Sequence, residues 1–299
     1  MRSPLQFVAT SEHARFEEFC DACRRERYIG LCFGSPGVGK TVSARQVTRA
    51  AAFESLRPPF SDRPEQLAAL QGLTALLFTP DVINGPRAVT NQVLTLWNRL
   101  LFVEAASRPR RGHGPAEERT DTARQIVGGR SRTVRDANRK VVALEESMAP
   151  EAFLHPLKLL VIDEADRLKN TSLEQVRHLF DRGAFGLVLI GMPGLEKRLA
   201  RYPQLYSRVG FVHHYRPLPI DEMRSILVNA AEQLVASPPA QGLTDPSVMA
   251  EILRITGGNL RLVVRLLTQI ARILEVNEID IVSVEVVEAA REVLVIGAA

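Results

Sequence analysis

The chain has 299 residues, of which 45% are hydrophobic and 24% are charged, and its formal net charge at pH 7 is +4. These values are ordinary for a globular protein, and with only three cysteines they exclude a disordered chain, a collagen-like fibre and a disulfide scaffold. No apolar run approaches the ~18 residues of a membrane span, and the N-terminus lacks the apolar core of a secretory signal. We therefore expect a cytoplasmic protein that does not contact membranes.

Apolar periodicity predicts alternating helices and strands over the first two thirds of the chain. An amphipathic helix is expected from Ser11, taken as its N-cap, to Arg27. Short apolar runs predict strands at Ile29–Phe33, Leu73–Phe78, Leu159–Ile162, Phe185–Ile190 and Val209–Tyr215. Helical spacing is found around residues 93–101, 132–146 and 173–180. This alternation, with one strand apolar throughout, indicates an α/β fold in which a parallel sheet is flanked by helices.

Two cysteines in the first helix have the C-x-x-C spacing of metal and redox sites. Cys20 and Cys23 share helical spacing with Phe16 and Phe19, and no second Cys or His pair lies nearby. Core packing is therefore favoured over a metal site, because free cysteine is usually buried.

The pattern changes after Pro217-Leu218-Pro219, beyond which helical periodicity dominates. The strongest helix there contains Leu260, Val263, Val264, Leu267, Ile270 and Leu274. We therefore predict an α/β core over residues 1–219 and a small all-helical domain over residues 220–299.

Positive charge is concentrated in the basic segment between Ala105 and Lys140, which contains nine arginines and one lysine but only four acidic residues. Such a segment suits a polyanion such as nucleic acid. Its glycines are equally typical of a solvated, flexible insertion. The sequence leaves both interpretations open.

The segment Gly34-Ser35-Pro36-Gly37-Val38-Gly39-Lys40-Thr41 fits G-x-x-x-x-G-K-[ST] and lies between a predicted strand and a predicted helix. Its glycines allow backbone N–H groups to converge on phosphate oxygens, and the helix directs its positive dipole end at the same anion. Lys40 is expected to reach the β- and γ-phosphates, and the Thr41 hydroxyl is expected to bind Mg²⁺.

A second motif follows the buried strand Leu159–Ile162. This strand delivers Asp163 to its carboxyl end, which is the edge where α/β folds bind ligands. Asp163 is expected to hold Mg²⁺ with Thr41, and Glu164 is expected to activate the attacking water. The two motifs together indicate a nucleoside triphosphatase.

The order of these motifs resembles that of AAA+ ATPases, including Ser207-Arg208 before the last strand and Gly257-Gly258-Asn259-Leu260-Arg261 at the start of the strong helix. More narrowly, Leu160–Leu168 and Val188–Leu199 resemble the transposition ATPases of the TnsC, TniB and MuB type. The similarity extends over roughly residues 10–290, and the nucleotide motifs are its most specific part.

The resemblance implies an AAA+ P-loop core followed by a helical lid, and an ATPase that assembles as a ring or filament on double-stranded DNA for a partner transposase. It makes Arg208 the arginine finger supplied to a neighbouring subunit and Arg261 the lid arginine, although local sequence alone favours ordinary surface arginines. The implied catalytic residues are Lys40, Glu164, Arg208 and Arg261. The implied nucleotide-binding residues are Gly34, Ser35, Pro36, Gly37, Val38, Gly39, Lys40, Thr41, Val42 and Asp163.

In such families the segment after the second core strand often contacts the DNA backbone. That segment is Thr79–Arg87 here, which makes Arg87 the first candidate for a DNA contact. The basic segment supplies the second set of candidates, Arg130, Arg132 and Arg135.

One position departs from the family pattern. The fourth core strand ends in Gly191-Met192, where relatives usually have a polar residue that positions the attacking water. Because a thioether is a weak hydrogen-bond acceptor, we expect slow or partner-dependent hydrolysis. Two alternatives stay open: an ATPase that acts on protein partners, as in secretion-linked relatives, and an ATP-gated scaffold with negligible hydrolysis.

Overall fold

The computed structural model describes residues 7–56, 64–107, 156–234 and 242–294. Its internal contacts define two compact units. The helical unit comprises Met1–Glu18, Gly34–Lys40 and His214–Ala299, and the sheet unit comprises Phe19–Phe33 and Thr41–His213. The helix predicted at residues 132–146 and most of the basic segment lie outside the described residues.

The sheet unit is built around a five-stranded sheet with the strand order β2-β3-β4-β1-β5. The pairs β2–β3, β3–β4 and β4–β1 are parallel. The strands are β1 (Ile29–Phe33), β2 (Ala75–Phe78), β3 (Leu159–Ile162), β4 (Gly186–Gly191) and β5 (Val209–His214). The α/β fold predicted from the sequence is confirmed.

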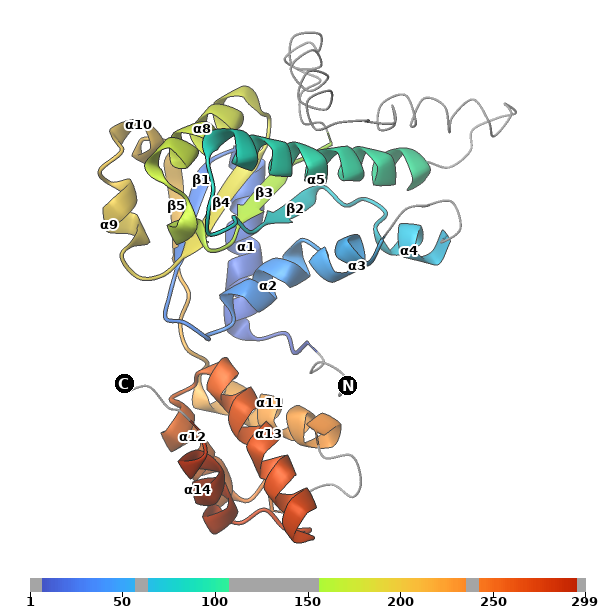
Figure 1. Cartoon of the computed structure of the whole chain (residues 1–299), viewed down its shortest axis with the longest axis vertical. Helices are drawn as coiled ribbons and strands as arrows, with labels where there is room; N and C mark the ends of the chain where they lie inside the picture. Colours follow the sequence, from blue (N-terminus) through green and yellow to red (C-terminus); the bar gives the residue numbers. More distant parts are fainter. Residues whose placement is uncertain (1–6, 57–63, 108–155, 235–241, 295–299) are drawn as a thin grey trace. The chain divides into compact units, whose positions relative to one another are not determined.

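Helices flank this sheet, as Figure 1 shows. They are α2 (Lys40–Val47), α3 (Ala50–Ser55), α4 (Pro64–Ala69), α5 (Pro86–Ser107), α8 (Asn170–Arg182), α9 (Leu195–Leu199) and α10 (Pro203–Tyr206), with the 3₁₀ turn η3 (Ala165–Arg167) directly after β3. The first helix, α1 (Ser11–Glu26), contributes its residues from Phe19 onward to this unit.

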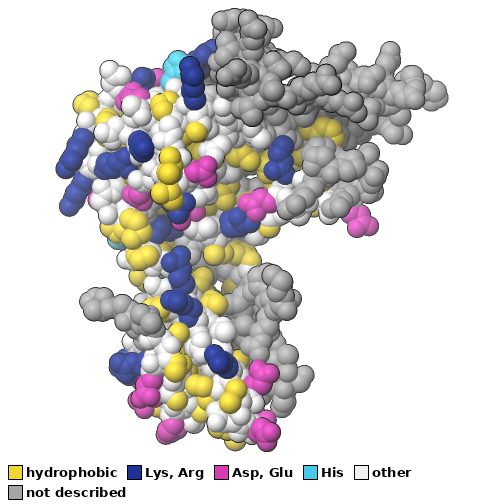
Figure 2. All heavy atoms as spheres, in the orientation of Figure 1, with side chains coloured by type: hydrophobic (Ala, Val, Ile, Leu, Met, Phe, Trp, Pro, Cys, Tyr) yellow, Lys and Arg dark blue, Asp and Glu magenta, His cyan; other side chains and the backbone are white. Residues whose placement is uncertain are grey.

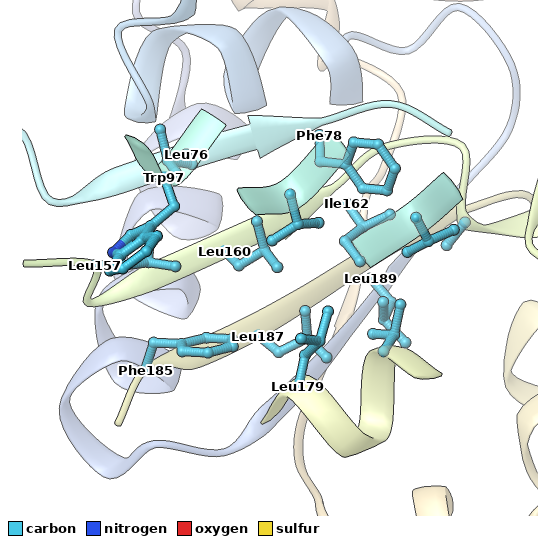
Figure 3. Packing of buried hydrophobic residues seen from close by; sticks show 14 of the residues in the cluster. Leu76, Phe78, Trp97, Leu157, Leu160, Ile162, Leu179, Phe185, Leu187 and Leu189 are labelled. Atoms are coloured by element: carbon cyan, nitrogen blue, oxygen red, sulfur yellow. The ribbon is translucent and has the colours of Figure 1, made fainter. Parts of the chain in front are cut away.

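The core of the sheet unit lies between one face of the sheet and the helices α5 and α8. Alternate strand residues such as Leu160 and Leu187 lie in this cluster with Trp97 of α5 and Leu179 of α8, as Figure 3 shows. All four residues of β3 are buried, as expected for a parallel strand that is covered on both faces. Trp97 is only 6% exposed, so it is a core residue.

The first helix packs against strand backbone at two glycines. A Cβ atom on Gly30 of β1 would lie 2.4 Å from Cys23 Sγ, and one on Gly186 of β4 would lie 2.2 Å from the Cys23 carbonyl oxygen. Cys20 and Cys23 have no exposed surface, and Phe19 is 8% exposed. The predicted core packing of the C-x-x-C residues is therefore confirmed.

The helical unit contains α11 (Ile220–Leu234), α12 (Pro246–Thr256), α13 (Leu260–Asn277) and α14 (Val284–Glu292). Their apolar faces enclose a second core that includes Met223, Ile252, Val263, Leu266 and Val287. Three of these helices begin at side-chain caps, namely Asp245, Asn259 and Ser283. Within the described residues, no helix combines the length and apolarity that crossing a membrane requires.

The start of α1 differs from the prediction. Thr10, not Ser11, is the N-cap, because the Thr10 hydroxyl accepts a hydrogen bond from the His13 N–H at 3.1 Å. Ser11 is instead the first helical residue, and its N–H donates to the Glu222 carboxylate at 3.1 and 3.2 Å. Local sequence does not reveal this choice, since Thr and Ser are both good caps and the contact with Glu222 is distant in sequence.

Candidate active site

The glycine-rich loop Gly34–Gly39 connects β1 to α2. Gly37 and Gly39 have φ angles of 81° and 113°, in the left-handed region that residues with a Cβ atom rarely adopt. Lys40, the first residue of α2, donates from its ammonium to the carbonyl oxygens of Gly34 and Ser35 at 2.6 and 2.8 Å. The loop thus lies between a strand and a helix in chain order, as the motif requires.

The remaining predicted nucleotide-binding residues differ in exposure. Val38 is 3% exposed, whereas Ser35 and Pro36 are exposed. Val42 is 45% exposed on the first turn of α2.

Thr41 and Asp163 are 122 residues apart in the sequence, and the sheet unit brings them into contact. The Thr41 hydroxyl donates to Asp163 Oδ2 at 2.7 Å. Asp163 is 4% exposed, and its second oxygen accepts the Glu164 N–H at 2.9 Å. A buried carboxylate with both oxygens engaged is held in one orientation. The two residues predicted to hold Mg²⁺ therefore lie together.

This pair fits a magnesium ion in its chemistry. Hydroxyl and carboxylate oxygens are the ligands that Mg²⁺ prefers, and the ion usually takes one or two protein ligands with phosphate oxygens and waters. In the part of the chain that the structure describes, no group of three or more His, Cys, Asp or Glu residues could hold a metal ion. A hydroxyl and a carboxylate side by side suit a metal ion whose other ligands are phosphate oxygens and waters.

Glu164, the predicted catalytic base, is held in a strained backbone conformation and an ion pair. Its φ of 52° is unusual for a residue with a side chain. Its carboxylate pairs with Arg167 of η3, which also donates to the Pro80 carbonyl oxygen at 3.3 Å. The side chains of Glu164 and Arg167 are 46% and 39% exposed, so the pair is open to solvent. The ion pair therefore engages the carboxylate that hydrolysis would need.

At the end of β4, a backbone N–H group binds a carboxylate from the segment Asp163–Arg167, which also contains Glu164. The Met192 N–H donates to Asp166 Oδ2 at 2.7 Å. A Cβ atom on Gly191 would lie 2.5 Å from that oxygen, so any other residue at position 191 would displace the Asp166 carboxylate. The Met192 side chain is 42% exposed. Asp166 thus binds the backbone at the end of β4, and the exposed Met192 side chain remains at the position where relatives usually have a polar residue.

Arg208 lies directly before β5 and is bound within its own chain. Its Nε and Nη2 atoms donate to the two carboxylate oxygens of Asp181 at 2.5 and 2.9 Å, and Nη1 donates to the Gln204 carbonyl oxygen. Asp181 also accepts from Arg177 at 2.6 Å. Figure 2 shows Lys and Arg side chains gathered on this α9–α10 side of the sheet unit. Arg208 is therefore positioned by a bidentate ion pair with Asp181.

In the helical unit, the first turn of α13 lies against the glycine-rich loop. The Arg261 N–H donates to the Gly37 carbonyl oxygen at 3.2 Å, and the Arg261 side chain is exposed. Asn259 precedes it as the N-cap and donates to the Pro36 carbonyl oxygen at 2.8 Å. The structure thus brings the backbone of Arg261, the predicted lid arginine, next to the glycine-rich loop Gly34–Gly39, called the phosphate loop below.

The candidate DNA contact Arg87 is exposed on the first turn of α5. The loop before it is fixed by buried Asn84, which donates to the carbonyl oxygens of Asp81 and Arg167 at 2.9 and 2.8 Å. Val82 and Ile83 in this loop are 73% and 85% exposed. Arg130, Arg132 and Arg135 lie outside the described residues.

Sequence reasoning assigned no role to several residues that the structure places at these sites. Asp166 and Arg167 stand in the same D-E-A-D-R run as the predicted base, and Asn259 stands in the G-G-N-L-R run, so their motifs could have drawn attention to them. No sequence signal marks Asp181 or Asn84, because their partners are distant in the chain.

Comparison with known proteins agrees with this geometry. The family model described as "AAA domain" matches residues 23–199. A Staphylococcus aureus protein named "Potential ATP-binding protein" is 35% identical over 303 residues, covering 99% of each chain.

Two solved structures share the fold at low sequence identity. The Thermotoga maritima RuvB Holliday junction branch migration motor is 16% identical with a TM-score of 0.52, covering 96% of this chain and 70% of that chain. The Aeropyrum pernix ORC1 protein in complex with DNA is 19% identical with a TM-score of 0.53, covering 95% of this chain and 65% of that chain. With the family match, the full-length relative and the phosphate loop, this chain belongs to the AAA domain family of P-loop ATPases.

Proposed function

We propose that this protein is an ATP-dependent, DNA-binding AAA+ ATPase that oligomerises on double-stranded target DNA and recruits or activates a partner transposase in the cytoplasm. ATP binding is supported above all by the 2.7 Å hydrogen bond between the Thr41 hydroxyl and the Asp163 carboxylate. It joins the ends of the two nucleotide motifs and leaves two oxygen ligands for Mg²⁺. When bound, Mg²⁺ neutralises phosphate charge.

In the proposed reaction, ATP and water give ADP and phosphate. Lys40 and the backbone N–H groups of Gly34–Gly39, except Pro36, which has none, bind the β- and γ-phosphates. Glu164 accepts the proton of a water whose oxygen attacks the γ-phosphorus, and the bond from that phosphorus to the β–γ bridging oxygen breaks. Arg208 of a neighbouring subunit neutralises charge on the transferred group, and Arg261 contributes from residues 220–299, the proposed lid.

The DNA part of the proposal is supported by charge and by the sequence resemblance. Arg87 is exposed on a helix start next to a loop that Asn84 fixes. The basic segment with Arg130, Arg132 and Arg135 adds positive charge. An ORC1 protein of the same fold has been solved in complex with DNA. The transposase partner is supported only by the sequence resemblance around Leu160–Leu168 and Val188–Leu199.

Duplex binding with ATP, with ADP and without nucleotide, measured over a series of salt concentrations, tests this function. We expect binding that requires ATP, is largely independent of DNA sequence and weakens steeply with salt. Arg87→Ala should lower the affinity for all sequences alike and reduce the salt slope by roughly one.

Arg254→Ala is the matched control, because Arg254 pairs with Glu251 on α12 and should leave DNA binding unchanged. Absence of ATP-dependent duplex binding would remove the DNA function and favour a protein substrate. Unchanged binding by Arg87→Ala would move the contact to the basic segment. A transposase added to the assembly on DNA should show faster strand transfer.

A second candidate is an ATP-gated scaffold with negligible hydrolysis. Two observations favour it: Glu164 is engaged by Arg167, and Met192 stands where a polar side chain is usual. Turnover measured with and without DNA separates the two functions, since a scaffold stays inactive on DNA.

A further inference from the structure

Asn259 forms hydrogen bonds with two parts of the helical unit. Its side-chain oxygen accepts the N–H groups of Arg261 and Leu262 at 3.1 and 3.2 Å, which caps α13. Its side-chain nitrogen donates to the Pro36 carbonyl oxygen at 2.8 Å. One amide thus fixes both the start of the helix and the backbone of the phosphate loop. A cap alone would need only the oxygen.

The approach between this side chain and the loop is close. A Cβ atom on Gly37 would lie 2.2 Å from Asn259 Oδ1, so any other residue at position 37 would displace the amide. The Arg261 N–H adds a second bond from the helix start, to the Gly37 carbonyl oxygen at 3.2 Å. Two successive loop carbonyls, those of Pro36 and Gly37, therefore point at α13.

The orientation of these carbonyls determines the orientation of the N–H groups. In a planar trans peptide, the C=O and N–H bonds point in opposite directions. Since the carbonyls of Pro36 and Gly37 point at α13, the N–H groups of Gly37 and Val38 point to the opposite side of the loop. Those are donors that a phosphate would use in this motif.

We propose that Asn259 is a positioning residue for ATP binding: it holds the phosphate loop with its N–H donors already aligned, and it ties α13 to that loop. This inference rests on the proposed nucleotide site. Asn259 acts through the backbone of Pro36 and Gly37 and does not touch the phosphates itself. Its effect is therefore on affinity for the phosphate groups.

Asn259→Asp is the informative variant. Aspartate has the same shape and is an equally good N-cap, but when ionised it cannot donate to the Pro36 carbonyl oxygen. Asn259→Ser is a second variant, which keeps a capping oxygen but lacks the amide donor. The control is Ser283→Ala, which removes the cap of α14 in the same unit.

Two measurements on the 299-residue protein test whether Asn259 positions the phosphate loop. Without nucleotide, amide hydrogen exchange in residues 34–40 should become at least about fivefold faster in Asn259→Asp and Asn259→Ser but not in Ser283→Ala. Dissociation constants for ATP and for ADP should both rise at least about fivefold in the same two variants.

Unchanged loop exchange together with ATP and ADP affinities within twofold of the parent protein would overturn the proposal. An equal loss in Ser283→Ala would also overturn it, because the effect would then come from general destabilisation. If the parent protein binds no nucleotide, the proposed function fails, whereas the exchange measurement still decides whether Asn259 holds the loop.

Discussion

At the scale of single residues, Lys40 and Glu164 have separable tasks. Lys40→Ala removes the ammonium that faces the phosphate loop, so we expect nucleotide binding to be lost. Glu164→Gln keeps the side-chain shape but cannot accept a proton, so ATP should bind normally while hydrolysis stops. Nucleotide titration and phosphate release measure the two effects. Hydrolysis by Glu164→Gln at the parent rate would show that the base has been wrongly assigned.

The ion pair between Glu164 and Arg167 leads to a second residue-level prediction. Exposed ion pairs contribute up to about 1 kcal/mol, so releasing Glu164 by Arg167→Gln should raise basal ATP turnover by no more than about fivefold. Arg254→Gln breaks a similar exposed Arg–Glu pair on α12 and should leave turnover unchanged. A fall in turnover would show that Arg167 assists hydrolysis instead of restraining it.

Burial raises the pKa of the Cys23 thiol, so the thiol loses its proton only at high pH. Desolvation raises the pKa of Cys23 from 9.0 to about 12. Because the folded pKa is above the unfolded one, the associated stability is present below pH 9 and is lost as the pH rises toward 12. We expect the free energy of unfolding to fall more steeply over this range in the parent than in Cys23→Ala. Parallel pH profiles in denaturant titrations would contradict this prediction.

At the scale of elements, the packing of α1 on the sheet depends on a glycine in a neighbouring strand. Gly186→Ala would place a Cβ atom 2.2 Å from the Cys23 carbonyl oxygen, and backbone cannot move aside as a flexible side chain can. We expect a loss of about 1–3 kcal/mol in the free energy of unfolding, which is typical of overpacking. Denaturant titration measures it, and a stability equal to that of the parent would show that α1 shifts freely on β4.

Sequence patterns predicted the elements better than the contacts between them. Ile29–Phe33 and Leu159–Ile162 have the predicted bounds, because each is an apolar run that ends at polar or glycine-rich sequence. The strand predicted from Leu73 begins instead at Ala75, because the Leu73 N–H bonds to the Leu70 carbonyl oxygen in a turn.

The candidate site was predictable where its residues share a motif. The segment Gly34–Thr41 and the pair Asp163-Glu164 could be identified because phosphate and metal chemistry restrict residue types at fixed spacing. The contact between Arg208 and Asp181 could not be predicted, since any exposed acidic residue could have been its partner. The contact of Asn259 with the Pro36 carbonyl oxygen could not be predicted either, because the role of helix cap already accounts for an asparagine at that position.

At the scale of the whole molecule, the proposed site is shared between subunits. An arginine supplied in trans can raise phosphoryl-transfer rates by ~10³ or more, so isolated monomers should be nearly inactive. Arg208→Ala and Lys40→Ala subunits should each be inactive alone, yet mixtures should recover part of the activity. Some interfaces in a mixture pair an intact Lys40 with an intact Arg208. Failure of every mixing ratio, despite co-assembly shown by light scattering, would place Arg208 outside a shared site.

The ion pair between Arg208 and Asp181 has a consequence for how such an assembly would grow. Arg208 already has a carboxylate partner, so joining a neighbour's nucleotide is an exchange of one anion for another. The new contact is favoured only by the difference in free energy between the pair with the nucleotide and the pair with Asp181. The terminal phosphate of ATP offers more charge at that point than ADP does, so a subunit loaded with ADP would compete poorly with Asp181. The assembly would then stop growing once its terminal subunit had hydrolysed ATP to ADP.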